Sequence, residues 1–328
     1  MNKIIFLFII ALCFASCLNH RDITNTVYCQ VDSEISEFPD SSFFSDITCM
    51  YHYKDKVYIL DKKRGDVVAL SEDFNTMKYI CRHGEAPYET VWPFTFNVWN
   101  DTVYIVDFGT RSMKMYYQGK FSGSFLLSNA NENRFCLNDS LIYLSATTDS
   151  SSFLLIDKCF YEKQIPQGKV IFERTPFKTI ISNQKHILYN KSKGLFTIAC
   201  CYPYIEQYTP TGEYVKTFDI SYVPIIKDAI KEAEKYSSKE KSIYRYIYDA
   251  YLANDYIYIL CSLRDFYDDY KVNTILVFSI NDNMKLISSY ILPHDIYSSF
   301  CVSDTYIFAA TNITGATIEK IPLRDANK

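Results

Sequence analysis

Glycine and proline are scarce in this 328-residue chain, with nine glycines, each standing alone, and ten prolines. This excludes collagen-like and low-complexity chains and leaves no glycine-rich loop that could hold a phosphate. An excess of charge of one sign is also missing, because 34 Lys and Arg face 38 Asp and Glu, a formal net charge of −4. Without a basic excess, nucleic acid has no electrostatic attraction to the protein, and we expect no nucleic-acid partner.

Motifs of catalysis and of metal binding are missing as well. The five histidines are isolated in the sequence, and no Gly-x-Ser-x-Gly motif is present. We therefore predict no catalytic residue, metal ligand or cofactor from a motif. A disulfide framework is also not expected. Of the eleven cysteines, Cys13 and Cys17 belong to the N-terminal segment, and most of the other nine lie in apolar strand patterns that predict buried free thiols.

The N-terminal segment has the features of a targeting signal. Lys3 precedes the apolar residues 4–12, a run too short to span a bilayer. Small residues before Cys17, Ala15 and Ser16, resemble a bacterial lipobox. We expect residues 1–16 to be a lipoprotein-type signal peptide, Cys17 to carry the lipid, and residues 17–26 to form a lipidated tether to the membrane. The alternative is an ordinary secretory signal cut near Ala15 or Ser16, with Cys17 incidental.

Aromatic residues are abundant, with 29 Tyr and 23 Phe, and they favour strands. One strand pattern recurs six times, at aligned positions 57, 103, 141, 195, 257 and 306. Polar pairs such as Asn100-Asp101 and Asn254-Asp255 precede most copies, and Gln118-Gly119 indicates a hairpin. Residues 27–323 divided by six give about 50 residues per unit, the length of a four-stranded blade. The sequence therefore predicts an all-β, six-bladed β-propeller over residues 27–328.

Two segments depart from this repeat. Residues 224–236 change to a helical period, which predicts a helical insertion between blades four and five. The last unit is one strand short, while residues 26–35 alternate polar and apolar side chains without a local partner. We predict that this N-terminal strand pairs with residues 316–321 and closes the last blade.

A resemblance to a known family rests on residues 80–89. Gly84, Pro87 and Glu89 match the Gly-x-Gly-Pro-Gly-Glu segment that joins blades in six-bladed, NHL-like or TolB-like propeller lipoproteins of Bacteroidetes, whereas Ala86 and Tyr88 replace glycines. The resemblance implies the propeller fold and a bacterial cell-envelope location, and it implies no activity. In lipoproteins of this type, an acidic run after the cysteine is associated with surface display. Residues 18–22 lack such a run, so we expect a periplasm-facing anchor.

The predicted function is a membrane-tethered binding or scaffolding module for an unknown protein, peptide or glycan. The alternative is a calcium-dependent, lactonase-like hydrolase, or a lyase, acting on a small molecule. Such a site would be assembled from different blades, where no spacing motif can appear. Asp46, Asn97 and Asp249 are the polar inner-strand candidates for the channel. Trp92 and Trp99 are interpreted as core residues rather than as a ligand platform.

Overall fold

The computed structural model describes residues 25–38, 41–173, 175–240, 243–264, 270–312 and 315–323. The predicted signal peptide, Cys17 and most of the predicted tether lie outside these ranges. Among the helices in the described ranges, none is both long and apolar enough to cross a membrane. The nine cysteines from Cys29 onward are all free thiols and most are buried, as the sequence predicted.

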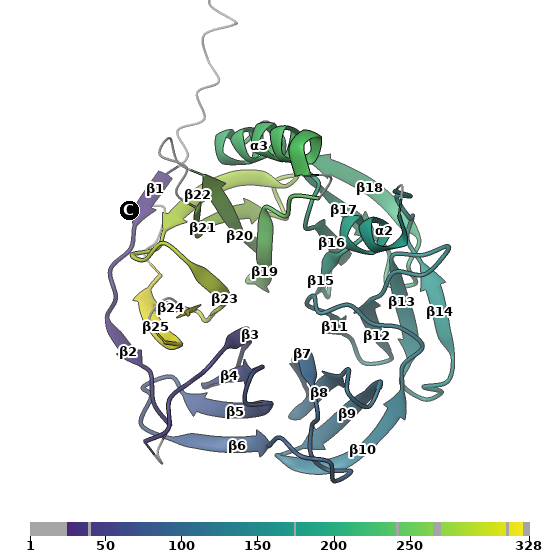
Figure 1. Cartoon of the computed structure of the whole chain (residues 1–328), viewed down its shortest axis with the longest axis vertical. Coiled ribbons are helices and arrows are strands. Elements are labelled where there is room, and N and C mark those ends of the chain that lie inside the picture. The colour runs from purple at the N-terminus through teal and green to yellow at the C-terminus, as the bar shows by residue number, and fades with distance from the viewer. Residues whose placement is uncertain are drawn as a thin grey trace, which may run out of the picture.

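Six sheets stand in a ring around a central channel and form the predicted six-bladed propeller (Figure 1). Blade 1 consists of β3 (Ile47–Tyr53), β4 (Lys56–Asp61), β5 (Asp66–Ser71) and β6 (Met77–Cys81). Blade 2 consists of β7 (Pro93–Trp99), β8 (Thr102–Asp107), β9 (Ser112–Tyr117) and β10 (Lys120–Leu126). Blade 3 consists of β11 (Cys136–Leu137), β12 (Leu141–Ser145), β13 (Phe153–Asp157) and β14 (Gln164–Gln167).

The other three blades follow the same inside-to-outside order. Blade 4 consists of β15 (Lys185–Asn190), β16 (Gly194–Ala199), β17 (Tyr204–Tyr208) and β18 (Tyr214–Asp219). Blade 5 consists of β19 (Ile247–Ala253), β20 (Tyr256–Arg264), β21 (Tyr270–Ser279) and β22 (Lys285–Ile291). Blade 6 contains β23 (Tyr297–Val302), β24 (Tyr306–Thr311) and β25 (Thr317–Pro322). The first strand of each blade faces the channel (Figure 1).

The N-terminal segment closes the ring, but not entirely as predicted. β2 (Ser33–Ile35) pairs antiparallel with β25 and supplies the fourth strand of blade 6, which confirms the predicted closure. β1 (Asn25–Tyr28) instead pairs in parallel with β22 and adds a fifth strand to blade 5. The prediction that residues 26–35 form one strand on the last blade was therefore wrong for its first half. β22 presented an open edge that the sequence did not reveal, and the segment crosses from one blade to the next.

Two of the polar pairs between strands adopt tight turns with positive φ angles at both residues. Asn100 and Asp101 have φ angles of 47° and 60°, and Asn254 and Asp255 have 46° and 63°. Two successive positive φ angles give a turn whose twist matches that of the flanking strands, and Asn and Asp tolerate this conformation best among residues with a Cβ. These turns fix the register of the inner and second strands.

The described residues also contain two helices, of which α3 lies at the outer edge of the ring (Figure 1). α3 (Pro224–Glu240) is the predicted insertion between blades 4 and 5, and it buries Ile226 and Ala229 against both blades. α2 (Pro176–Ser182) was not predicted. It begins where the Thr175 side chain accepts a hydrogen bond from the Lys178 amide, with Pro176 in the first turn.

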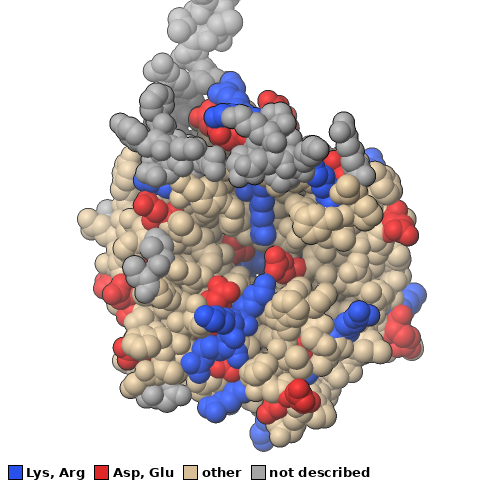
Figure 2. Space-filling model, viewed as in Figure 1, with Lys and Arg blue, Asp and Glu red and all other residues tan. Residues whose placement is uncertain are grey.

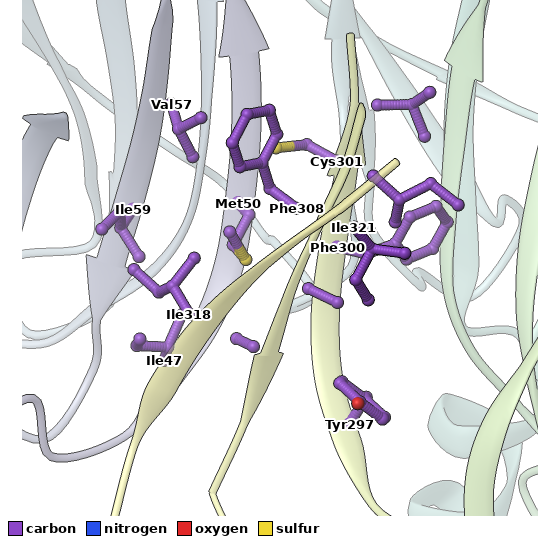
Figure 3. Packing of buried hydrophobic residues seen from close by; sticks show 14 of the residues in the cluster. Ile47, Met50, Val57, Ile59, Tyr297, Phe300, Cys301, Phe308, Ile318 and Ile321 are labelled. Atoms are coloured by element: carbon purple, nitrogen blue, oxygen red, sulfur yellow. The ribbon is translucent and has the colours of Figure 1, made fainter. Parts of the chain in front are cut away.

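The apolar core fills the spaces between neighbouring blades. In the space between blades 1 and 6, Ile47 and Met50 of β3 face Phe300 and Phe308 of β23 and β24, and all four are fully buried (Figure 3). Each such side chain contributes about 1.5–3 kcal/mol by leaving water. Because each blade packs on two neighbours, this burial fixes the inner strands around the channel.

Candidate functional site: the channel and its mouth

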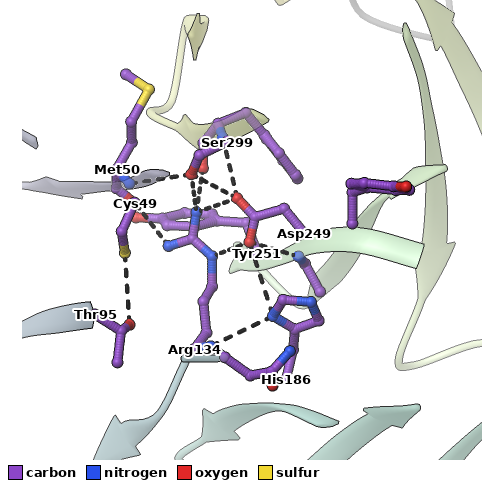
Figure 4. A network of polar contacts seen from close by, with 12 residues as sticks. Cys49, Met50, Thr95, Arg134, His186, Asp249, Tyr251 and Ser299 are labelled. Carbon is purple, nitrogen blue, oxygen red and sulfur yellow. Dashed lines mark hydrogen bonds and ion pairs between the residues drawn. The ribbon is translucent and has the colours of Figure 1, made fainter. Parts of the chain in front are cut away.

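One buried arginine closes the channel. Arg134 lies two residues before β11, and only 5% of its surface is exposed. Its Nε donates to Asp249 Oδ1 at 2.5 Å and its Nη2 to Oδ2 at 2.6 Å, a bidentate pair (Figure 4). Nη1 donates to the Met50 carbonyl at 2.6 Å, and Nη2 also reaches Ser299 Oγ at 3.2 Å. The guanidinium thus joins blades 1, 3, 5 and 6.

Blades 2 and 4 are tied to the same centre. The Arg134 carbonyl accepts a hydrogen bond from the Ile187 amide at 2.9 Å, and the Arg134 amide donates to His186 Nδ1 at 3.4 Å. In blade 1, the Cys49 thiol lies 3.7 Å from Thr95 Oγ1 of blade 2. We call this group of contacts around Arg134 and Asp249 the hub (Figure 4). It connects the inner strands of all six blades.

The Asp249 carboxylate is ionised, and both of its oxygens accept hydrogen bonds from the protein. Burial alone would raise its pKa, but the charge and the hydrogen bonds of Arg134 outweigh burial and hold the pKa below its usual range. Besides Arg134, the carboxylate accepts hydrogen bonds from Ser299 Oγ at 2.7 Å and from the Phe300 and Ala250 amides. Asp249 is therefore a structural anchor for Arg134.

The three predicted channel residues make no hydrogen bond or ion pair with one another within the described residues. Asp249 lies in the hub. Asn97 Nδ2 donates to the Phe135 carbonyl at 2.8 Å, and Asn97 lines a cavity of about 50 Å³ that Arg134 also lines. Asp46 accepts a hydrogen bond from Asn312 at 3.2 Å, and burial raises its pKa. Each of the three has its own protein partner.

A larger cavity of about 300 Å³ lies at the other side of Arg134. Arg134 and Asp249 belong to its wall, together with a set of side chains from blades 1, 4, 5 and 6 that includes Thr48, His186, Arg245, Tyr248, Tyr270 and Ile296. The space-filling view shows basic and acidic side chains gathered around the hollow at the centre of the ring (Figure 2). We call this cavity the channel mouth.

Arg245 is a partly buried cation in the channel mouth without an acidic partner among the described residues. Its Nε donates to the Ile247 carbonyl at 3.1 Å and its Nη2 to the Tyr248 carbonyl at 2.8 Å. Glu132 lines the same cavity, but it is paired with Lys62 at 2.9 Å. An arginine remains protonated in proteins, so the wall of the channel mouth holds three basic side chains, Lys62, Arg134 and Arg245, against the two acidic ones of Glu132 and Asp249. Glu132 attracts Arg245 through space but makes no ion pair with it.

Two buried polar atoms in the same cavity also lack a partner among the described residues, namely Thr48 Oγ1 and His186 Nε2. Buried polar atoms are nearly always hydrogen-bonded, and an exception calls for a physical reason. Both atoms belong to residues that line the channel mouth beside Arg245. Because both atoms have almost no accessible surface, a ligand in the cavity would reach them only after a shift of the two side chains.

The hydrogen bonds of His186 determine what its free nitrogen can do. Because the Arg134 amide donates to Nδ1, the proton of the neutral ring is assigned to Nε2. Burial lowers the pKa of His186 to about 3, with Asp249 acting in the opposite direction, so the ring is neutral at pH 7. The Tyr248 carbonyl also raises the pKa of His186, and its effect is smaller than that of Asp249. Nε2–H is thus a donor, as are the Thr48 hydroxyl and Arg245.

The sequence indicated only part of this site. Asp249 was found because a charged residue interrupted an apolar inner-strand pattern. Arg134 carries a comparable signal, since it precedes the apolar residues 135–137, but its partner lies 115 residues away. Arg245 and His186 were missed because nothing in the sequence shows which blades meet at the channel. In the described ranges, no group of three or more His, Cys, Asp or Glu side chains could hold a metal ion.

Comparisons with known proteins support the fold. No family model matches the chain, and no curated protein matches it in sequence. Among solved structures, a candidate exported protein of Bacteroides fragilis is 14% identical, with a TM-score of 0.60 over 92% of this chain and 99% of that one. A member of the DUF4221 family from Bacteroides vulgatus is 11% identical, with a TM-score of 0.61 over 91% and 98%.

A third similar structure belongs to an enzyme. Virginiamycin B lyase of Staphylococcus aureus is 12% identical, with a TM-score of 0.52 over 90% of this chain and 100% of the lyase. At these identities the likeness concerns the fold alone. The chain is therefore a six-bladed β-propeller whose structural neighbours include a candidate exported protein and a DUF4221 member of Bacteroides and a lyase.

Proposed function

We propose that this protein is a binding propeller of the bacterial cell envelope, and that its channel mouth takes up a small ligand through an anionic group, most simply a carboxylate. The observation that carries the proposal is the partly buried Arg245, which has no acidic partner among the described residues. Thr48 and His186 line the same cavity, and a shift of their side chains would add Thr48 Oγ1 and His186 Nε2 as two more donors. A carboxylate accepts several hydrogen bonds at once and suits such a set of donors.

The size and floor of the cavity favour a small ligand. About 300 Å³ is at the lower end of the range for small-molecule sites. The hub closes the channel beneath the cavity, so the group that enters meets Arg134 and Asp249, which already satisfy each other. Arg245 is therefore the cation that is left for the ligand.

The test is a thermal-shift screen of small carboxylates, including uronic acids, with the matching amides and alcohols. A ligand that binds only the folded protein raises the Tm in proportion to the logarithm of its concentration above Kd. We expect carboxylates, but not their amides, to raise the Tm, and we expect Arg245→Gln to abolish the rise.

Arg82→Gln is the matched control, because Arg82 is an exposed arginine that packs on the Tyr79 ring and does not line the channel mouth. This variant should retain the full response. A response that survives in Arg245→Gln, or a preference for neutral ligands, would contradict the proposal.

The envelope location and the lipid anchor belong to the same proposal. Support comes from the lipobox-like residues before Cys17 and from a structural neighbour that is a candidate exported protein. We expect Cys17 to be lipidated and the propeller to face the periplasm. Cys17→Ser should move the protein from the membrane fraction to the soluble fraction, and protease treatment of intact cells should leave the native protein uncut. Soluble native protein, with an unmodified N-terminus by mass spectrometry, would refute the anchor.

The rival proposal is a lyase or a calcium-dependent hydrolase. Its support is the likeness to virginiamycin B lyase, of which a catalytically inactive histidine-to-alanine variant is known, and the presence of His186 in the channel mouth of this chain. A general base needs a free nitrogen lone pair, however, and in His186 the Nδ1 lone pair already accepts the Arg134 amide. This favours a binding role for His186. Turnover of a bound carboxylate that is lost in His186→Asn would reverse the preference.

A further inference from the structure

An exposed aromatic cluster lies next to the channel mouth. Phe94, which lines the mouth, stacks on Phe108 with ring centroids 4.7 Å apart and an interplanar angle of 8°. Trp92 stands edge-on to both rings, at 5.3 Å from Phe94 and 5.6 Å from Phe108. Trp92 is 49% exposed, so its interpretation as a core residue was wrong. We call these three rings the aromatic platform.

The aromatic platform is held rigidly by a buried carboxylate. Asp107 accepts hydrogen bonds from the Trp92 amide at 2.8 Å, the Val91 amide at 3.2 Å and the Gly109 amide at 3.2 Å. Burial alone would raise the pKa of Asp107, but these hydrogen bonds outweigh it and lower the pKa. A large aromatic ring kept exposed on a fixed backbone is pre-organised for contact with a ligand.

The platform separates two cavities. Phe94 lines the channel mouth, while Phe108 lines a second cavity of about 240 Å³ together with Arg111, Ser128 and Asn129. Arg111 makes no ion pair with a described acidic residue. Phe94 is covered by Phe108 and by Lys62, whose Nζ lies 4.8 Å from the centre of the ring, so a ligand that extends from one cavity to the other would contact Trp92 and Phe108. At each end it would meet a guanidinium without an ion-pair partner among the described acidic residues.

We propose that the ligand is a short acidic oligosaccharide, with one carboxylate at Arg245 and a sugar ring on the aromatic platform. This inference rests on the proposed carboxylate site. Aromatic faces carry negative partial charge and attract the C–H faces of a sugar ring, and the polar side chains around both cavities suit its hydroxyl groups. A peptide that ends in a free carboxylate is the competing ligand, which the experiment distinguishes.

The two tryptophans of the chain make a direct test possible. Trp99→Phe leaves Trp92 as the only tryptophan, and Trp99 Nε1 has no hydrogen-bond partner to lose. We expect trigalacturonate to change the emission of Trp92 in this variant with a saturable dependence. Maltotriose, which is neutral, and the tripeptide Gly-Gly-Phe should leave it unchanged.

Calorimetry on the full chain supplies the second readout. Trp92→Ala should weaken trigalacturonate binding roughly tenfold. Tyr117→Ala is the matched control, because Tyr117 is an exposed aromatic residue of the same blade outside both cavities, and it should bind as the native protein does.

The two proposals fail in different ways. If carboxylates bind through Arg245 but Trp92 reports no ligand and Trp92→Ala binds normally, the oligosaccharide inference is wrong and the carboxylate site stands. If Gly-Gly-Phe changes the Trp92 emission and trigalacturonate does not, the ligand is a peptide and the inference is also overturned. If no carboxylate binds at all, both proposals fall.

Discussion

Arg134 and Asp249 form an ion pair whose energetics depend on both partners being present. Transfer of two charges into the interior is costly, and the bidentate hydrogen bonds offset this cost only while the pair is intact. The Met50 and Phe300 carbonyls accept further hydrogen bonds from Arg134. The main effect of the pair is therefore to fix the arrangement of the inner strands, and its net contribution to the free energy of unfolding is small.

Removal of one partner should be more harmful than removal of both. Arg134→Met leaves the Asp249 carboxylate buried without a counter-charge, which we expect to lower the free energy of unfolding by about 3–5 kcal/mol. The double variant with Asp249→Leu should recover most of this loss, because no charge then remains in the hub. Guanidinium chloride unfolding of the three proteins provides the measurement. A single variant that loses less than about 1 kcal/mol would show that the hub is not a tight pair.

His186 gives the stability a predictable pH dependence. Its folded pKa of about 3 lies below the ordinary histidine pKa of 6.5, so between these values the unfolded chain binds a proton that the folded protein does not. Stability is therefore fully present above about pH 6.5 and is lost as the pH falls toward 3, at up to about 1.4 kcal/mol per pH unit. The depressed pKa of Asp249 acts in the same direction at lower pH.

His186→Asn should flatten this dependence. Between pH 6.5 and 5, the unfolding free energy of the native protein should fall more steeply than that of the variant. The reason is that unfolding of the native protein takes up nearly one extra proton, at His186. The exposed His83 serves as the control position, and His83→Asn should keep the native slope. Chemical unfolding at a series of pH values measures the slopes. Equal slopes for the native protein and His186→Asn would show that His186 is not buried as a neutral ring.

Strands and turns could be predicted from the sequence where neighbouring residues determine the backbone conformation. Alternating side chains and polar pairs such as Asn100-Asp101 indicated the hairpins of five blades, and the helical period indicated α3. β14 and α2 were missed because residues 164–182 lack both signals, and α2 depends on the capping Thr175 and on tertiary contacts. The pairing of β1 with β22 was missed because a free strand edge is visible only after the blades have formed.

The N-terminal strands should have separable effects. A chain that begins at Gln30 lacks β1 but keeps β2, so the ring remains closed and the unfolding free energy should fall only slightly. A chain that begins at Glu37 also lacks β2 and exposes the edge of β25, so it should be much less stable and should aggregate. Size-exclusion chromatography and chemical unfolding distinguish the two. A chain from Asn25 is the control, and equal stability of the Gln30 and Glu37 chains would contradict the assignment of closure to β2.

At the scale of the whole molecule, the hub gives the ring two unequal ends. One side of Arg134 has a cavity of about 300 Å³, and the other has one of about 50 Å³. Thr48, His186 and Arg245 come from blade 1, blade 4 and the segment before β19, and the ring alone brings them together. The repeat in the sequence predicted the ring, but it could not predict this convergence, because the convergence depends on the rotation of each blade about the channel.

The most direct test of the account is a double-mutant cycle between Arg245 and the ligand's charge. Calorimetry would measure the affinities of the native protein and of Arg245→Gln for the carboxylate that raises the Tm most and for its amide. We predict a coupling energy of at least about 1.5 kcal/mol, as expected for a charge pair in close contact. Native protein that binds the carboxylate and the amide equally, or that binds neither, would contradict the assignment of the channel mouth as an anion site.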